Sequence, residues 1–281
     1  AAGIGTTKTG GFVDIRSGAG TAKSSGMITI RTANADATGV SGALVFSSGE
    51  AESGNSGDIT IGSGPATYGN GGFIRLLVGR SDSGSGGIVD IAAGRSTGGV
   101  GGTATLVGGQ GSTHGGTVTI TAGQGVGGSG GALVMSAGIG TVKDGGYVDL
   151  RSGAGTAKSS GEVTVRSANA VATGVSGALV FSSGTTKAGA SGDISIGTGL
   201  ATGGVAGSVY LTAGRSNQAN GADVVISAGT TSSTGGGAVS ITAGQGIGGS
   251  GGSLVFAAGI GTTKTGGFVD IRSGAGTAKS S

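Results

Sequence analysis

The amino-acid sequence predicts an all-β fold, a parallel β-solenoid with coils of about 15 residues. Two observations lead to this prediction. A short unit, with leading glycines such as Gly11, Gly26, Gly42 and Gly57, repeats along the whole chain with only small changes in length. Within each unit, large apolar residues occupy alternate positions, which is the period of a β-strand.

The alternation assigns each strand an inner and an outer face. Each unit is numbered from the glycine that precedes the alternation, such as Gly11 in GFVDIRSGAGTAKSS. Positions 3 and 5 are aliphatic or Phe in nearly every unit, as in the pairs Val13/Ile15 and Leu44/Phe46. Because alternate side chains of a strand point to opposite faces, we expect positions 3 and 5 to face inward and positions 2, 4 and 6 outward.

The rest of each unit is built of small residues. Position 7 is Ser, Ala or Gly, and position 8 is usually a glycine, which predicts a turn with positive φ. Positions 9 to 15 have little apolar bulk, as in AGTAKSS. We therefore expect a thin coil in which a wall of large residues packs on a wall of small ones. Such coils would stack about 4.8 Å apart in ladders of like residues.

Composition excludes several other architectures. Glycine supplies 72 of 281 residues while proline occurs once, and glycine does not fall at every third position, so neither collagen nor a bundle of polyproline-II helices fits. A β-propeller blade needs a period of about 40–45 residues. The hydrophobic share of 35% favours burial over disorder.

A long period encloses the short one. The segment from Ala1 to Ser25 recurs without change from Ala257 to Ser281. Related segments begin at Gly11, Gly146 and Gly267, at intervals of 135 and 121 residues. We therefore interpret residues 1–256 as one superrepeat and 257–281 as its overlap into the next. The prediction is one continuous solenoid over 1–281, a window of a longer chain that continues in both directions.

Charge and cysteine content exclude further classes. The net charge of +3 arises partly from residues 257–281, which hold three basic residues and one acidic one; without them, thirteen basic residues face twelve acidic ones. This balance predicts no nucleic-acid partner. There is no cysteine, and therefore neither a disulfide framework nor a thiolate metal site. No apolar run approaches the roughly 18 residues of a membrane span.

No residue set predicts catalysis. The one histidine, His114, lies alone, and the acidic residues are scattered without a recurring pair. The GxGxxG match at Gly123–Gly128 follows from the glycine content alone. We expect no enzyme activity, no metal and no cofactor.

The outward face of the strands is the candidate site. Single exposed apolar residues are ordinary, but a stacked row of them marks a contact surface. Likewise, the recurring Asp and Arg residues form either solvated pairs or a periodic docking point for a neighbouring chain or an anionic glycan. The candidate lateral contact comprises Phe12, Asp14, Arg16, Arg31, Val45, Phe73, Tyr147, Asp149, Arg151, Tyr210 and Phe268.

Units such as GTVTITAGQGVGGSG and GDITIGSGPATYGNG give the whole chain a resemblance to the glycine-rich β-solenoid repeat regions of giant secreted or cell-surface fibrous proteins. This resemblance is architectural, and it implies an extracellular or cell-surface structural role.

The function predicted is therefore that of a non-enzymatic shaft of an extracellular filament, appendage or fibrous adhesin, which self-associates into a filament or bundle. A glycan-binding adhesin is the alternative. Ice binding is less favoured, because the outward positions form no uniform threonine array.

Overall fold

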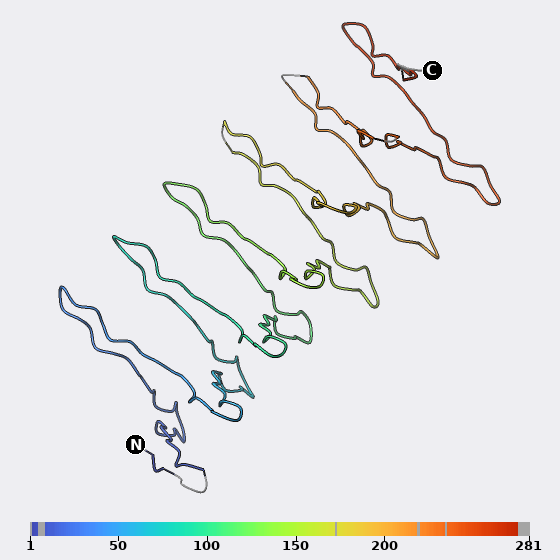
Figure 1. Ribbon diagram of the computed structural model, residues 1–281. Helices are drawn as coiled ribbons and strands as arrows, with labels where there is room; N and C mark the ends of the chain where they lie inside the picture. Colours follow the sequence, from blue (N-terminus) through green and yellow to red (C-terminus); the bar gives the residue numbers. More distant parts are fainter. Residues whose placement is uncertain (1, 5–8, 172, 218–219, 234, 275–281) are drawn as a thin grey trace. The chain divides into compact units, whose positions relative to one another are not determined.

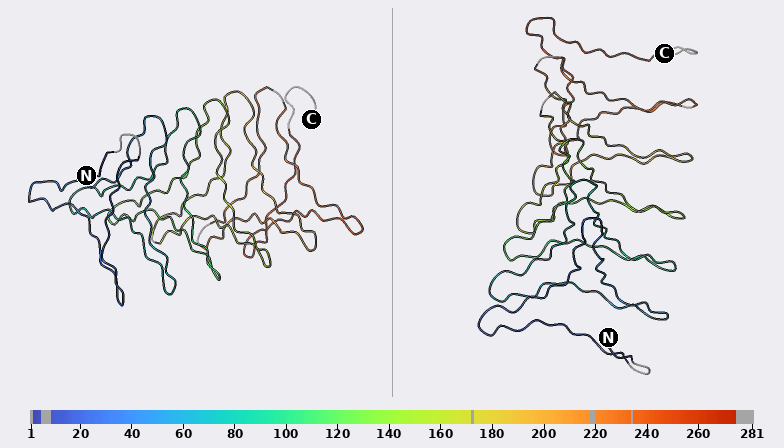
Figure 2. Two further views of the ribbon diagram at one scale, coloured as in Figure 1. Left: turned by 90° about the horizontal axis from the view of Figure 1, so that it is seen from below. Right: turned by 90° about the vertical axis from the view of Figure 1, so that its left-hand side faces the viewer.

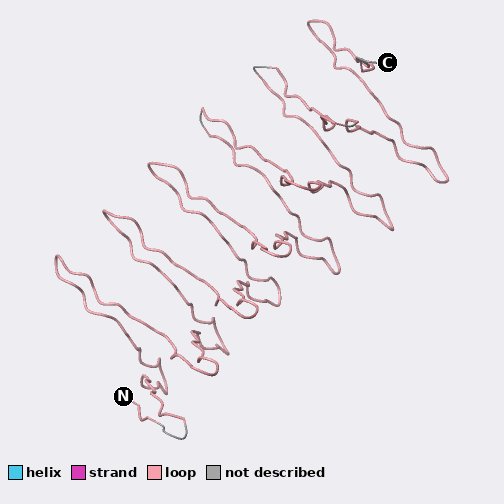
Figure 3. Ribbon diagram, in the orientation of Figure 1, coloured by secondary structure: helices cyan, strands magenta, loops and turns pink. Residues whose placement is uncertain are grey.

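Extended segments and bends make up the structure, a computed structural model that describes residues 2–4, 9–171, 173–217, 220–233 and 235–274. Over these residues there is neither a helix nor a strand (Figure 3). The extended segments lead into one another through narrow loops (Figure 1). The bends are consequently the landmarks of the fold.

The chain divides into two compact halves, Ala1–Ser136 and Ala137–Ser281. The second half begins 135 residues after Ala2, so the division falls at the long period of the sequence. Within each half, extended segments alternate with loops in the same way (Figure 2).

The bends recur at the short period of the sequence. In the units that begin at Gly11, Gly42 and Gly57, the chain bends at residues 21–23, 52–54 and 67–69. These are positions 11 to 13 of each unit, and the same positions bend in most later units. The spacing from one bend to the next shortens by one between those that begin at residues 112 and 126, where the sequence has a shortened unit. The repeat therefore determines where the chain turns.

A hydrogen bond between two glycines closes most of the loops at their base. The amide of the glycine at position 1 donates to the carbonyl of the glycine at position 8 of the preceding unit. For example, Gly26 N–H donates to Gly18 O at 3.0 Å and Gly102 N–H donates to Gly94 O at 2.8 Å. Ten of the eleven backbone–backbone hydrogen bonds of the described residues are of this kind.

Close approach at the loop base explains two features of the repeat. A Cβ atom on Gly102 would lie 3.0 Å from the Gly94 nitrogen and 3.4 Å from the Cβ of Ala93. A Cβ on Gly161 would likewise lie 3.3 Å from the Cβ of Ser152. At these closed loop bases, position 1 is glycine because backbone faces it, and position 7 is small because it packs against that glycine. Ala222 at position 1 and Val78 at position 7 are exceptions elsewhere in the repeat.

In several loops the residue at position 10 is a glycine packed against backbone. A Cβ atom on Gly155 would overlap the carbonyl oxygens of Lys158 and Ser159. The same overlap recurs at Gly20, with the carbonyl oxygens of Lys23 and Ser24. These contacts show that such a loop folds tightly over its own backbone and leaves no space for a side chain at its position 10. Other units carry Ala, Ser or Thr at position 10, as at Ser96 and Thr231.

We predict that Gly155→Ala opens its loop and removes the hydrogen bond from Gly161 N–H to Gly153 O, which spans 3.0 Å. The added methyl group has no space beside the Lys158 carbonyl, so the backbone must shift. The temperature coefficient of the Gly161 amide proton shift in NMR should change to that of a solvent-bonded amide. Gly153→Ala is the matched control, because a Cβ on Gly153 meets open space. Equal coefficients in wild type and Gly155→Ala would contradict the assigned crowding.

The predicted β-solenoid is wrong. Every backbone–backbone hydrogen bond of the described residues joins residues three to eight apart, whereas stacked coils require bonds between residues about one full unit apart. Neighbouring coils therefore form no ladder. The physical reason lies in the second half of each unit. It closes on itself as a tight loop through its glycines and cannot form an extended wall opposite positions 3 and 5.

The turn chemistry predicted for position 8 is also wrong. Among the described residues, positive φ occurs at Gly69, Gly189 and Gly248, and at no residue other than glycine. These glycines lie at positions 12 and 13, within the bends. Position 8 is glycine beside the loop base and needs no left-handed backbone.

No described residue is buried, so the predicted inner wall is not a core. The alternation persists in a weaker form. In the segment at 42–47, Leu44 at position 3 is 50% exposed, Val45 at position 4 is 77% exposed and Phe46 at position 5 is 64% exposed. The loop backbone shields one face of the segment slightly, but nothing covers it.

The total accessible surface quantifies this exposure. It amounts to 27831 Å² for a chain of 25.6 kDa. A folded monomer of that mass exposes about 10,000 Å², and the extended chain about 37,000 Å². Most of the burial that stabilises an ordinary domain is therefore absent, and it becomes available only through contact with other molecules.

Candidate contact surface

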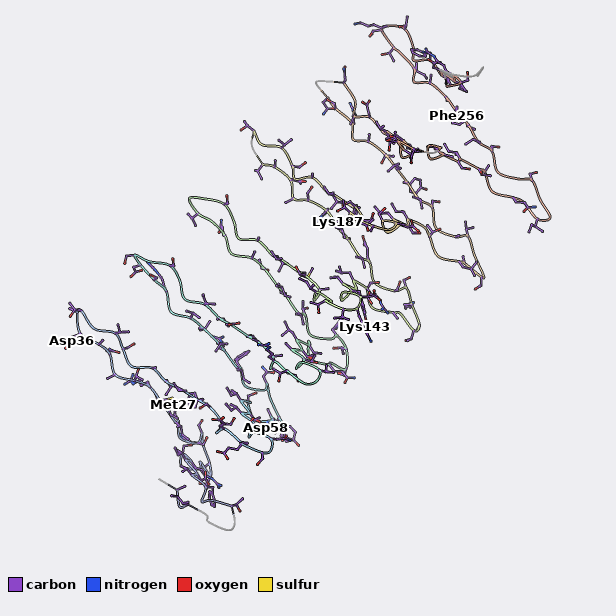
Figure 4. All side chains as sticks on the ribbon, in the orientation of Figure 1. Met27, Asp36, Asp58, Lys143, Lys187 and Phe256 are labelled. Carbon is purple, nitrogen blue, oxygen red and sulfur yellow. The ribbon has the colours of Figure 1, made fainter. Side chains whose placement is uncertain are left out.

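The apolar residues of the predicted lateral contact all lie on extended segments. Phe12, Phe73, Tyr147 and Phe268 occupy position 2 of their units, and Val45 and Tyr210 occupy position 4. Each is between 77% and 88% exposed. Side chains of these segments stand away from the backbone, as Figure 4 shows for Met27 and Phe256. Their aromatic and aliphatic surface is thus free to contact a neighbour.

Exposure does not by itself distinguish these residues. Positions 3 and 5, expected to be internal, are about half to four fifths exposed as well. Segments with an apolar residue at position 2 or 4 therefore present apolar side chains on two faces. The lateral contact is a property of an assembly, and it stays a prediction.

The recurring Asp and Arg residues pair within their own segments. Arg16 lies 2.6 Å from Asp14 through its terminal nitrogen. Arg151 donates from Nε to Asp149 Oδ1 at 2.9 Å and from its terminal nitrogen to the second carboxylate oxygen. Arg272 and Asp270 repeat this arrangement. The bond to Asp149 raises the pKa of Arg151, so that guanidinium stays protonated.

Two of the repeating arginines lack such a partner. Arg31 and Arg166 have Thr29 and Thr164 in place of the aspartate two residues before, and neither forms an ion pair with a described acidic residue. Arg166, Ser167, Ala168 and Asn169 line a hollow of about 400 Å³. This hollow combines a free positive charge with polar side chains, a chemistry that suits an anion.

A second hollow, of about 420 Å³, is apolar. It is lined by Phe46, Ile59, Thr60 and Ile61, which belong to two consecutive extended segments of the first half of the chain. Phe46, Ile59 and Ile61 occupy positions 3 and 5, the face that was expected to be internal, and Thr60 occupies position 4. An apolar hollow open to solvent marks the place where a further apolar side chain would pack.

The sequence analysis missed a set of apolar residues in the loops. They lie at or near the bends and are at least 92% exposed, more than any large apolar residue of the extended segments. The signal was a single large apolar residue between glycines, as in GQGVGG, within a half-unit interpreted as small. The set comprises Ile4, Val40, Tyr68, Val100, Val126, Ile139, Val142, Val171, Val175, Leu200, Val205, Ile247 and Ile260.

Within the described part of the chain, no three His, Cys, Asp or Glu side chains gather as metal ligands would. No helix in that part has the length and apolarity needed to cross a membrane.

Comparison of the chain with protein-family models, curated proteins and solved structures gave no match.

Proposed function

We propose that this chain is a non-enzymatic structural protein, a repeating component of the shaft of an extracellular filament, appendage or fibrous adhesin. The observation that carries the proposal is the exposed apolar surface of every extended segment. A chain that is 35% hydrophobic and exposes 27831 Å² gains free energy by associating with other chains.

Uniformity supports a structural role over a catalytic one. Catalysis requires one place where particular groups meet in a concave, water-excluding pocket. Here the same short unit recurs from end to end, and the Asp14–Arg16, Asp149–Arg151 and Asp270–Arg272 pairs recur at the long period. A repeating surface suits a repeating contact, which is what a filament needs.

The test is concentration-dependent assembly of the purified chain. We expect sedimentation velocity to show single chains at nanomolar concentration and large particles at micromolar concentration, with filaments visible by negative-stain electron microscopy. Assembly should weaken in low concentrations of urea, because burial of apolar surface drives it. A chain that stays monomeric at every concentration would contradict the proposal.

A glycan-binding adhesin is the second candidate. The free guanidinium of Arg166, beside Ser167 and Asn169, favours a carboxylated or sulfated polysaccharide. A chain that does not assemble, but co-sediments with such a polymer in a salt-dependent manner, would favour this function over the structural one.

A further inference from the structure

Four segments of the chain have the same unusual composition. They read GALVFS at 42–47, GALVMS at 131–136, GALVFS at 177–182 and GSLVFA at 252–257. We call them the LVF segments. Each has three consecutive large apolar residues, no charge and no proline. Short windows with high β-propensity and no charge are the ones that pair most readily with strands of other chains.

The backbone of the LVF segments is open to a partner. Apart from the glycine at position 1, none of their residues takes part in a hydrogen bond between described backbone groups. Their side chains are exposed on both faces, and the central valines are 76–79% exposed. An extended segment with unpaired amides and carbonyls is a template for an added strand.

Other extended segments are less suited to backbone pairing. GFVDIRSG carries the Asp14–Arg16 pair, so an identical strand beside it could set carboxylate against carboxylate. GDITIGSG and GTVTITAG have threonine at position 4, which leaves their outer face polar. The LVF segments offer neutral, apolar surface on both faces, and so does GSVYLT at 207–212, whose central residue is Tyr210 instead of valine.

We infer that the LVF segments pair, backbone to backbone, with the LVF segments of a second copy of this chain. A second copy is the partner that supplies the same neutral faces and the same unpaired backbone, four times in 281 residues. The central valine of one segment then lies beside the central valine of its partner, whether the two strands run parallel or antiparallel centred on it. This inference rests on the proposed assembly and adds to it the strands that form the contact.

Charge placed at the centre of the LVF segments should block this pairing. We expect Val→Lys at all four centres to raise the concentration for half-assembly at least tenfold more than the control does, because like charges would face one another across each strand pair. The control adds the same four charges at position 4 of other segments, as Thr29→Lys, Thr119→Lys, Ser195→Lys and Ser240→Lys. The variant itself carries lysine at Val45, Val134, Val180 and Val255. An equal rise in the two variants would overturn the inference.

Spin labels give a readout of proximity that does not depend on the added charge. The chain has no cysteine, so cysteines introduced at the four valines can be labelled selectively. In assembled particles, we expect electron paramagnetic resonance lines broadened by spin–spin coupling that is lost on dilution with unlabelled chain. Cysteines at the four control positions should give sharper lines. Uncoupled valine labels in particles that still sediment would overturn the strand pairing alone. If light scattering detects no assembly of either the labelled or the unlabelled chain, the proposed function and the pairing are overturned together.

Discussion

Calorimetry of the dilute, unassembled chain should show no cooperative unfolding transition. A folded domain of 281 residues absorbs about 200 kcal/mol on unfolding near 60 °C. That heat comes from the loss of packed and hydrogen-bonded structure. Here no described residue is buried, and the described residues share eleven backbone–backbone hydrogen bonds. The heat capacity should therefore start close to that of an unfolded chain and rise without a peak.

The assembled chain provides the control for this experiment. If burial occurs between chains, the same protein at a concentration that gives large particles should show an endotherm and a positive change in heat capacity on dissociation. An endotherm of about 200 kcal/mol from sedimentation-verified single chains would show that one chain buries a core alone. That result would contradict the exposed fold.

Removal of the aromatic residues at position 2 should have the second large effect. We predict that the triple variant Phe12→Ser, Tyr147→Ser and Phe268→Ser raises the concentration for half-assembly at least about a hundredfold. Burying one such side chain contributes about 1.5–3 kcal/mol, and each 1.4 kcal/mol corresponds to a factor of ten. Sedimentation velocity over a concentration series measures the shift.

A matched variant tests whether position matters. Tyr68→Ser, Ile139→Ser and Ile260→Ser remove comparable apolar surface from the loops, where these side chains are 93–98% exposed. We expect this variant to assemble at close to the wild-type concentration, because the predicted contact lies on the extended segments. Similar shifts in both variants would show that any apolar loss weakens assembly, and the lateral contact through Phe12 and Tyr147 would be wrong.

Much of the local structure could be predicted from the residues. The short repeating unit sets the interval between bends, including the shortened interval between residues 112 and 126. The alternation of Leu44, Val45 and Phe46 indicates which side chains are the more exposed. The Asp–x–Arg spacing places Asp14 beside Arg16, because side chains two residues apart in an extended segment share a face. All of these features depend on neighbours in the sequence.

The exposed apolar surface could be predicted only in part. The outward aromatic residues were found because the alternation points to them, whereas Tyr68 and Ile139 were missed because they stand alone among small residues and match no period. The unpaired guanidinium of Arg166 follows from the absence of an aspartate two residues earlier. The sequence shows that this aspartate is missing. It indicates an unpaired arginine only when the structure shows that Arg16, Arg151 and Arg272 are each paired with an aspartate.

The sequence by itself determined the repeat, the bends and the apolar face of each extended segment, since these follow from residue order and backbone sterics. The tertiary structure alone decided that the coils do not stack. An alternating pattern states which face of a strand is apolar, but it does not state what covers that face. Coverage depends on the path of the small-residue half of each unit. Gly102 and Gly155 show that this half folds tightly onto its own backbone, so no part of the described chain covers the apolar face.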